Sequence, residues 1–292
     1  MKIDLHIHSK YSCDGEYTPS QLIEAAKAKA LEVVALSDHD TIIGVQEMMT
    51  ARKQANIKVI PAIELSGQIN EDPVHMLGYD IDPDSPRFNN YLEDFETLER
   101  NATIETVKRF KQELAMDYDI QEMTDRCLNS MFALVPIVEE LTTNPRYRDL
   151  AIVKPYLPSG DRCDMPVANF YWDHCTKGKR FYVYLDVPDY RHLIDEIHKD
   201  GGLAVLAHPF ELFYQNEEYL KAMIEAGVDG MEVYSSYHEK FQTLWYLDYA
   251  KKHDLLISGG SDYHGYFKPK VFLGAIDCED EGVFDPLLKR FR

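Results

Sequence analysis

Short apolar runs separated by amphipathic stretches occupy both ends of this 292-residue chain, and they constrain its fold most strongly. The expected strands are residues 3–7, 33–36, 57–60 and 74–79 in the first part, and 203–207, 230–233, 255–258 and 271–273 in the last. Helices are expected between most of them, one beginning with the capping box Thr18-Pro19-Ser20-Gln21 and another at Asp189. Buried strands alternating with helices predict an α/β fold built on a mostly parallel sheet or barrel.

Residues 85–185 lack this alternation and contain repeated prolines, so they are expected to form helices and loops. The sequence therefore predicts a barrel made of residues 1–84 and 186–292, interrupted by a mostly helical insertion of residues 85–185. Within the insertion, residues 146–180 contain seven basic and four acidic side chains. This basic stretch is interpreted either as a solvated face or as an anion-binding lid over the substrate.

The net charge of the chain disfavours some classes of binding partner. With 31 Lys and Arg against 50 Asp and Glu, the formal charge is −19. A surface this acidic repels long nucleic acids and anionic membranes, but small phosphorylated metabolites remain candidates. The five cysteines form no C-x-x-C pair, and no apolar run reaches the ~18 residues of a membrane span. We expect a cytoplasmic protein with reduced thiols, without a thiolate zinc site or a membrane anchor.

Histidines and acids gather where the predicted strands end. The motifs are Asp4-x-His6-x-His8, Ser37-Asp38-His39-Asp40, Glu64, His75, Ala207-His208-Pro209 and Ser261-Asp262-Tyr263-His264. Any single histidine here could be an ordinary core or capping residue. Because the carboxyl ends of barrel strands form one face, however, the group as a whole predicts a shared site. Imidazole and carboxylate ligands suit Zn²⁺, Mn²⁺ or Fe²⁺.

These motifs, in this order, resemble the polymerase and histidinol phosphatase (PHP) family of metal-dependent phosphoesterases. The resemblance implies a distorted seven-stranded (β/α) barrel that holds two or three divalent ions. Carried over by position, it implies a first metal site of His6, His8, Glu64 and Asp262, a second of Glu64, His75 and His208, and a third of Asp14, His39 and His264. Some members have histidine in place of Asp14, which leaves the occupancy of the third site open.

The expected reaction is attack of a metal-bridging hydroxide on phosphorus. Asp4 and Asp38 are expected to orient ligand imidazoles rather than to bind metal. His238 is a hypothetical leaving-group acid, with a helix-start surface histidine as the alternative, and Tyr234 beside it is a candidate substrate contact. Lys179 and Arg180 in the insertion are candidate phosphate clamps.

The substrate is less constrained than the chemistry. Relatives with a comparable insertion include nucleoside 3′,5′-bisphosphate phosphatases, an oligoribonucleotide-trimming enzyme and a phosphodiesterase of phosphoribosyl 1,2-cyclic phosphate. Nucleotide-acting members usually carry an Arg-Pro-His-like segment, whereas residues 164–170 here read DMPVANF. The sequence therefore favours a sugar phosphate or cyclic phosphodiester over a nucleotide. A non-catalytic metal-binding module and an amidohydrolase-type C–N hydrolase are the other classes, and the oligomeric state is open.

Overall fold

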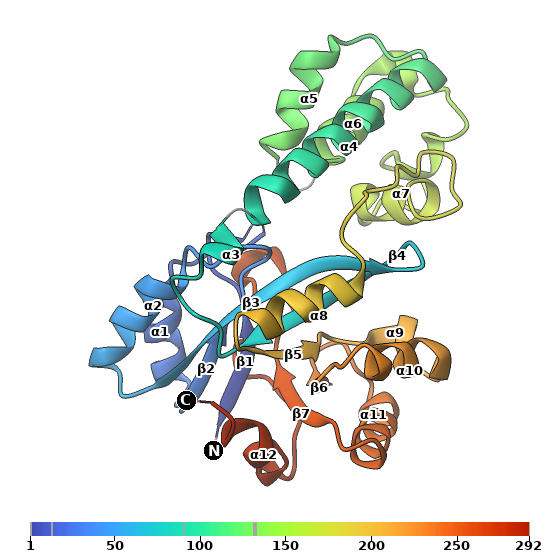
Figure 1. The fold of residues 1–292 in the computed structure, drawn as a ribbon. Coiled ribbons are helices and arrows are strands. Elements are labelled where there is room, and N and C mark those ends of the chain that lie inside the picture. Colours follow the sequence, from blue (N-terminus) through green and yellow to red (C-terminus); the bar gives the residue numbers. More distant parts are fainter. Residues whose placement is uncertain (1, 13, 90, 131–132, 292) are drawn as a thin grey trace. The chain divides into compact units, whose positions relative to one another are not determined.

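The computed structural model describes residues 2–12, 14–89, 91–130 and 133–291 (Figure 1). The chain forms two compact units, one of Met1–Glu93 with Val187–Arg292 and one of Asp94–Asp186. The first unit thus extends past the expected boundary at residue 84, because it includes the short helix α3 (Pro86–Asn89) and the beginning of α4 (Tyr91–Glu113).

The first unit is built on seven strands that pair in chain order. They are β1 (Ile3–Ile7), β2 (Val33–Leu36), β3 (Lys58–Ile69), β4 (Asp72–Tyr79), β5 (Leu203–Leu206), β6 (Gly230–Ser235) and β7 (Leu256–Gly260). Neighbouring strands are parallel except that β4 runs antiparallel to both β3 and β5. The chain after β7 returns to β1, where the His8 N–H donates to the Tyr263 carbonyl over 2.9 Å. The predicted seven-stranded α/β barrel is confirmed in this nearly closed form.

Two of the expected strands differ from the sequence prediction. Strand β3 continues well beyond residue 60, because it forms a hairpin with β4 through Asn70 and Glu71, both of which have positive φ as a two-residue primed turn requires. Glu64 consequently lies inside β3 rather than after it. The strand expected at residues 271–273 is wrong: this segment leads into a turn at Gly274, whose φ is +74°.

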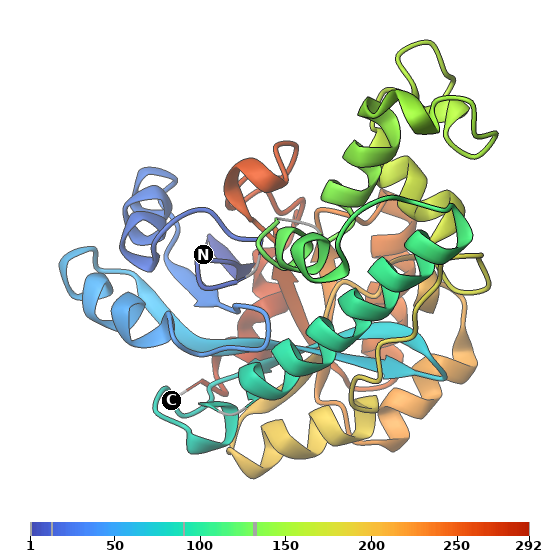
Figure 2. The ribbon, with the colours of Figure 1, turned by 90° about the horizontal axis from the view of Figure 1, so that it is seen from above.

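Helices flank the strands of this unit. They are α1 (Pro19–Ala28), α2 (Val45–Ala51), α8 (Tyr190–Lys199), α9 (Phe210–Phe213), α10 (Glu217–Glu225), α11 (Lys240–Lys252) and α12 (Asp285–Leu288). Both ribbon views show α1 and α2, in blue, beside strands β1 to β3 (Figure 1 and Figure 2). The capping box of Thr18 and Gln21 forms as expected, and the Asp189 side chain caps α8.

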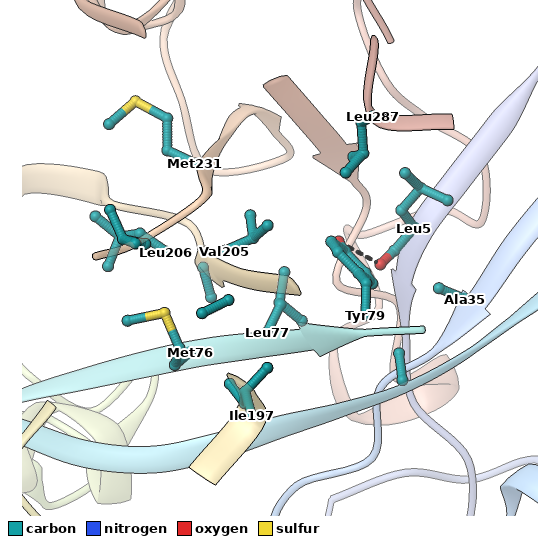
Figure 3. Close-up of a cluster of buried hydrophobic side chains, with 14 of the residues drawn as sticks. Leu5, Ala35, Met76, Leu77, Tyr79, Ile197, Val205, Leu206, Met231 and Leu287 are labelled. Atoms are coloured by element: carbon teal, nitrogen blue, oxygen red, sulfur yellow. Dashed lines mark hydrogen bonds between the residues drawn. The ribbon is translucent and has the colours of Figure 1, made fainter. Parts of the chain in front are cut away.

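The core of the barrel unit is shown in Figure 3, where side chains from β1, β2 and β4 to β6 meet residues of α8 and α12. Leu5, Leu77 and Val205 are among its fully buried members. Tyr79 is also fully buried, and its hydroxyl donates to the Leu5 carbonyl over 2.8 Å. This hydrogen bond ties β4 to β1 across the barrel interior and satisfies a phenol that would otherwise be buried unpaired.

The second unit contains most of α4, with α5 (Ile120–Leu128), α6 (Val135–Thr143) and α7 (Pro166–His174). It has its own apolar core, in which the rings of Phe110 and Phe181 stack at 4.0 Å. No strand occurs in residues 94–130 or 133–186, as the missing alternation predicted. In the part of the chain that is described, no helix combines the length and apolarity needed to cross a bilayer.

Candidate metal centre

Glu64 is a fully buried carboxylate on β3, and five imidazoles converge on it. Its Oε2 lies 2.9 Å from His6 Nε2, 3.1 Å from His8 Nε2 and 3.3 Å from His39 Nδ1. Its Oε1 lies 3.1 Å from His75 Nδ1 and 3.0 Å from His208 Nε2. The two oxygens of one carboxylate therefore face different sets of imidazoles, which is the arrangement of a group able to bridge two cations.

The strands place these side chains where the alternation predicts. His6 lies in β1 and His8 directly follows the strand, so both imidazoles point into the same end of the barrel. Strand β7 closes tightly against them: a Cβ on Gly260 would lie 2.1 Å from the Cβ of His6. Glycine is therefore required at this position for β7 to approach β1.

Asp262 and Asp14 add carboxylates on the other side of the histidines. Asp262 Oδ1 lies 3.0 Å from His8 Nε2 and 3.3 Å from His6 Nε2. Asp14 Oδ2 lies 3.1 Å from His264 Nε2, and its Oδ1 lies 4.0 Å from His39 Nε2. Each of the predicted metal ligands thus has a ligand atom within 4.0 Å of another one.

Three groups of these residues have ligand atoms close enough to hold an ion. They are His6, His8, Glu64 and Asp262; His39, Glu64 and His75; and His8, Asp14, His39 and His264. The first has the same members as the first predicted site. The second contains His39, whereas the prediction names His208, which contacts the same Glu64 oxygen as His75; the third adds His8 to its predicted members. The ligand assignment itself stays a prediction.

Several ligand atoms are buried here without a hydrogen-bond partner among the described residues. They are His8 Nε2, His39 Nδ1, His75 Nδ1, His264 Nε2, Asp14 Oδ1 and Asp262 Oδ1. Buried polar atoms are normally paired, so convergent unpaired nitrogens and carboxylate oxygens fit coordination of divalent cations. The residues present therefore suit the metal that the resemblance implies.

Charge coupling inside the cluster is strong. Burial alone would lower the pKa of His8, but attraction by the adjacent carboxylates of Asp262 and Glu64 outweighs it and raises the pKa to about 9. Burial opposes ionisation of Glu64, but the surrounding imidazoles hold its pKa well below its ordinary value. Protons and divalent cations compete for the same atoms in such a cluster.

Glu232, which was not selected from the sequence, contacts two of the candidate ligand residues. It is fully buried on β6, and its carboxylate lies 3.1 and 3.2 Å from His6 Nδ1 and accepts from the His208 N–H over 2.8 Å. A proton on His6 Nδ1 can donate to Glu232, which would leave Nε2, the nitrogen nearest Glu64, available to bind a cation. Ser12 contacts His8 Nδ1 at 2.9 Å in a similar position. A charged residue within an otherwise apolar strand was the available sequence signal.

Asp4 and Asp38 were expected to orient ligand imidazoles, but their carboxylates have other hydrogen-bond partners. Asp4 accepts hydrogen bonds from the N–H and hydroxyl of Ser261 and from the Gly274 N–H. Asp38 accepts from the N–H and hydroxyl of Ser9. Both carboxylates point at the backbone of ligand-bearing loops rather than at an imidazole nitrogen, so they hold those loops in place.

The expected roles of Tyr234 as a substrate contact and of His238 as a leaving-group acid are not supported by their positions. Strand β6 has an irregularity between Glu232 and Tyr234, and the additional residue breaks the alternation. Tyr234 therefore packs on Phe284 in the core instead of facing the histidines with Glu232. His238 Nδ1 donates to the Val233 carbonyl, and its Nε2 accepts from the Phe210 N–H. Neither nitrogen is left to protonate a leaving group.

The candidate clamps Lys179 and Arg180 lie in the helical unit, where Arg180 pairs with Glu113 at 2.5 Å. Two other arginines of the basic stretch, Arg146 and Arg162, are likewise paired with carboxylates. The lid role of the insertion and the clamp role of Lys179 and Arg180 stay predictions.

Lys268, which the sequence analysis does not select, lies beside the candidate centre. Its Nζ is 2.6 Å from Asp262 Oδ2 and 2.8 Å from the Tyr237 hydroxyl, which itself donates to Asp262. Lys268 and Tyr237 also line a pocket of about 220 Å³ together with His39, His75 and His208. The cluster of histidines and carboxylates therefore opens onto a small pocket that carries an ammonium group.

Comparison with known proteins identifies relatives that match along nearly the whole chain. The 5′-3′ exoribonuclease of Haemophilus influenzae is 28% identical, covering 90% of each chain. The phosphoribosyl 1,2-cyclic phosphate 1,2-diphosphodiesterase of Eggerthella lenta is 27% identical over 90% of this chain and 94% of its own. The 3′,5′-nucleoside bisphosphate phosphatase of Chromobacterium violaceum is 28% identical over 90% and 87%. These names confirm the predicted class, a hydrolase of phosphoric ester bonds, but not the substrate.

Two solved structures share the fold. A protein from Chromobacterium violaceum described as an amidohydrolase superposes with a TM-score of 0.74 at 23% identity, covering 99% of this chain and 97% of its own. A candidate metal-dependent phosphoesterase from Bifidobacterium adolescentis has a TM-score of 0.70 at 26% identity, covering 99% and 96%. The family model of the PHP domain matches residues 4–265. The chain therefore belongs to the PHP domain family, as its motifs predicted.

Proposed function

We propose that this protein hydrolyses phosphate esters of small metabolites with divalent cations held around Glu64. The observation that carries the proposal is the position of this carboxylate, fully buried between His6, His8 and His39 on one oxygen and His75 and His208 on the other. A purely structural site would not leave so many ligand atoms buried without a hydrogen-bond partner beside a pocket.

The chemistry combines the cations with groups of the chain. Bound divalent ions would lower the pKa of water and neutralise phosphate oxygens, as in other metal-dependent phosphoesterases. Lys268 places an ammonium group in the same pocket, where it can attract a phosphate and stabilise negative charge that develops during hydrolysis. Tyr237 donates to Asp262 and accepts from Lys268, so it holds both charged groups in place.

Two substrate classes are supported by different observations. The absence of an Arg-His pair in residues 164–170 favours a sugar phosphate or cyclic phosphodiester, the class of the Eggerthella lenta relative. The relatives from Haemophilus influenzae and Chromobacterium violaceum, which have similar identity, favour a ribonucleotide end or a nucleoside bisphosphate. The exoribonuclease relative argues against the expectation that long nucleic acids are excluded as substrates. That expectation stays a prediction.

The test is a phosphate-release screen with protein reconstituted with Mn²⁺, Zn²⁺ or Fe²⁺. The panel contains phosphoribosyl 1,2-cyclic phosphate, adenosine 3′,5′-bisphosphate, cyclic nucleotides, short oligoribonucleotides and phosphate-free amides. We expect release from at least one phosphate ester and none from the amides. Turnover of amides alone would indicate a C–N hydrolase, and metal binding without any turnover would indicate a non-catalytic module.

Variants of Glu64 test the proposed site. Both Glu64→Ala and the nearly isosteric Glu64→Gln should abolish every activity found and reduce the bound metal measured by elemental analysis. Glu47→Gln on α2 is the control, because the hydrogen bonds of Glu47 within the described part of the chain are to Ser20 of α1. Retention of metal and activity by a folded Glu64→Gln protein would show that the assignment is wrong.

A further inference from the structure

Phe210 has an unusual conformation at the edge of the candidate metal centre. It is two residues beyond His208, lines the same pocket as His208 and Lys268, and is 45% exposed. Its φ is +27°, a region that bulky side chains rarely adopt. Phe210 thus has an unfavourable backbone conformation, and burial of its apolar ring does not compensate for it.

The backbone around Phe210 is fixed by side chains from other elements. Its N–H donates to His238 Nε2 over 3.2 Å, and its carbonyl accepts from the Tyr246 hydroxyl over 2.6 Å. His238 is itself held, because its Nδ1 donates to the Val233 carbonyl and its ring stacks on Tyr246 at 5.0 Å. His238 therefore has a positioning task, which accounts for a half-buried histidine that the proposed chemistry does not use.

A second aromatic ring completes the surface. Tyr237 lies edge-on to Phe210, with the ring centroids 6.1 Å apart and the planes at 68°. Tyr237 is fixed in turn by Lys268 and Asp262. The lining of the pocket therefore combines candidate metal ligands and an ammonium group with an exposed aromatic ring.

We propose that Phe210 stacks on a planar ring of the substrate, a nucleobase, while the phosphate occupies the metal centre. This inference rests on the proposed phosphoesterase function and selects the substrate class within it. An aromatic face binds any base through its π-surface, whereas a sugar phosphate without a base cannot use that contact. The preference drawn from residues 164–170 is thereby reversed in favour of nucleoside phosphates. The strained backbone of Phe210 agrees with this role. Strained conformations persist where the surrounding structure holds the residue in place, and they are concentrated at functional sites.

The experiment compares adenosine 5′-monophosphate with ribose 5-phosphate, which share the 5-phosphorylated ribose and differ at C1, where one carries adenine and the other a hydroxyl. Specificity constants are measured if the Mn²⁺-loaded protein hydrolyses them, and competitive inhibition constants or calorimetric affinities if it does not. Wild-type protein should favour the base-bearing compound by on the order of tenfold or more, within the range that stacking of one base supplies. Phe210→Leu should remove most of this preference and change values for ribose 5-phosphate less than about twofold.

His238→Phe tests the positioning role, because it keeps a ring against Tyr246 but removes the acceptor for the Phe210 N–H. It should lower the same selectivity ratio, which a general loss of stability would not change. Phe241→Leu is the matched control, since Phe241 is an exposed phenylalanine (57%) on α11 outside this pocket. Equal binding of the two compounds by wild-type protein, or equal weakening by Phe210→Leu, overturns the inference. Absence of phosphate release from every ester would instead refute the proposed function.

Discussion

Glu232 joins two of the histidines that surround Glu64, and its replacement by glutamine isolates what that link contributes. The carboxylate has two acceptor oxygens, and it uses them for two donors, the His6 imidazole and the His208 backbone N–H. Glutamine has one acceptor oxygen and one NH₂ group. Because both carboxylate oxygens lie against His6 Nδ1, the NH₂ group faces that nitrogen in either orientation of the amide, and in one orientation it faces the His208 N–H as well.

The structure allows the size of the effect to be estimated. An NH₂ group against His6 Nδ1 favours the neutral ring with its proton on Nε2, the atom 2.9 Å from Glu64 Oε2. That proton would occupy the position of a metal-facing lone pair. Loss of such a supporting partner typically lowers metal affinity or activity about 10- to 100-fold, which is about 1.4 to 2.8 kcal/mol. Glu232→Ala would leave both donors buried and unpaired, and should destabilise the fold by about 2 to 6 kcal/mol.

The assay is a Mn²⁺ titration of the metal-free protein, followed by calorimetry and by activity on the ester found in the screen. Glu232→Gln should shift the half-saturating Mn²⁺ concentration upward by about 10- to 100-fold, with thermal unfolding of the metal-free protein changing much less. Glu196→Gln is the control, because Glu196 on α8 pairs with Arg87 away from the histidines. An unchanged Mn²⁺ dependence in a folded Glu232→Gln protein would refute the reasoning.

Other substitutions test the ammonium group of the pocket, the close approach of β7 to β1, and a buried hydrogen bond in the core of the barrel unit. Lys268→Met should lower kcat/KM for phosphate esters by about ten- to a hundredfold, because the pocket loses its ammonium group; an unchanged value in steady-state assays would exclude this role. Gly260→Ala should destabilise the fold by about 1 to 3 kcal/mol in urea unfolding and weaken metal binding, since the new Cβ would lie 2.1 Å from the Cβ of His6. Tyr79→Phe removes a buried hydroxyl bonded to Leu5 and Ser258, and should cost about 1 to 3 kcal/mol in urea unfolding without changing the Mn²⁺ dependence.

The apolar alternation was sufficient to predict most of the barrel, because short buried strands between helices have few other solutions. The prediction from alternation failed where the formation of a strand depends on a neighbouring strand or loop. Polar residues such as Ser66 and Gln68 belong to β3 because they lie opposite His75 and Pro73 of β4. Their own N–H groups donate to the Asp40 side chain and the Pro188 carbonyl, which are also distant in the chain. Residues 271–273 are apolar but lack a neighbouring strand, so they pass into the turn at Gly274 instead.

The candidate ligands could be selected from the sequence because metal-binding side chains are chemically distinctive and follow the strand ends. The supporting residues could not, because their roles depend on distances across the barrel. Glu232 resembles any acid in the sequence until β6 places it against His6. His238 resembles a catalytic acid until both its nitrogens prove to be hydrogen-bonded to backbone groups.

The sequence by itself thus determined the α/β class, the interrupted barrel, the family and the set of candidate metal ligands, because these follow from periodicity and from motifs in a fixed order. Only the tertiary structure decided which carboxylate contacts His6, that Lys268 lies beside Asp262, and that Phe210 is exposed at the pocket. The physical reason is that hydrogen-bond partners and exposed faces depend on contacts between strands and loops far apart in the chain, which local sequence patterns do not encode.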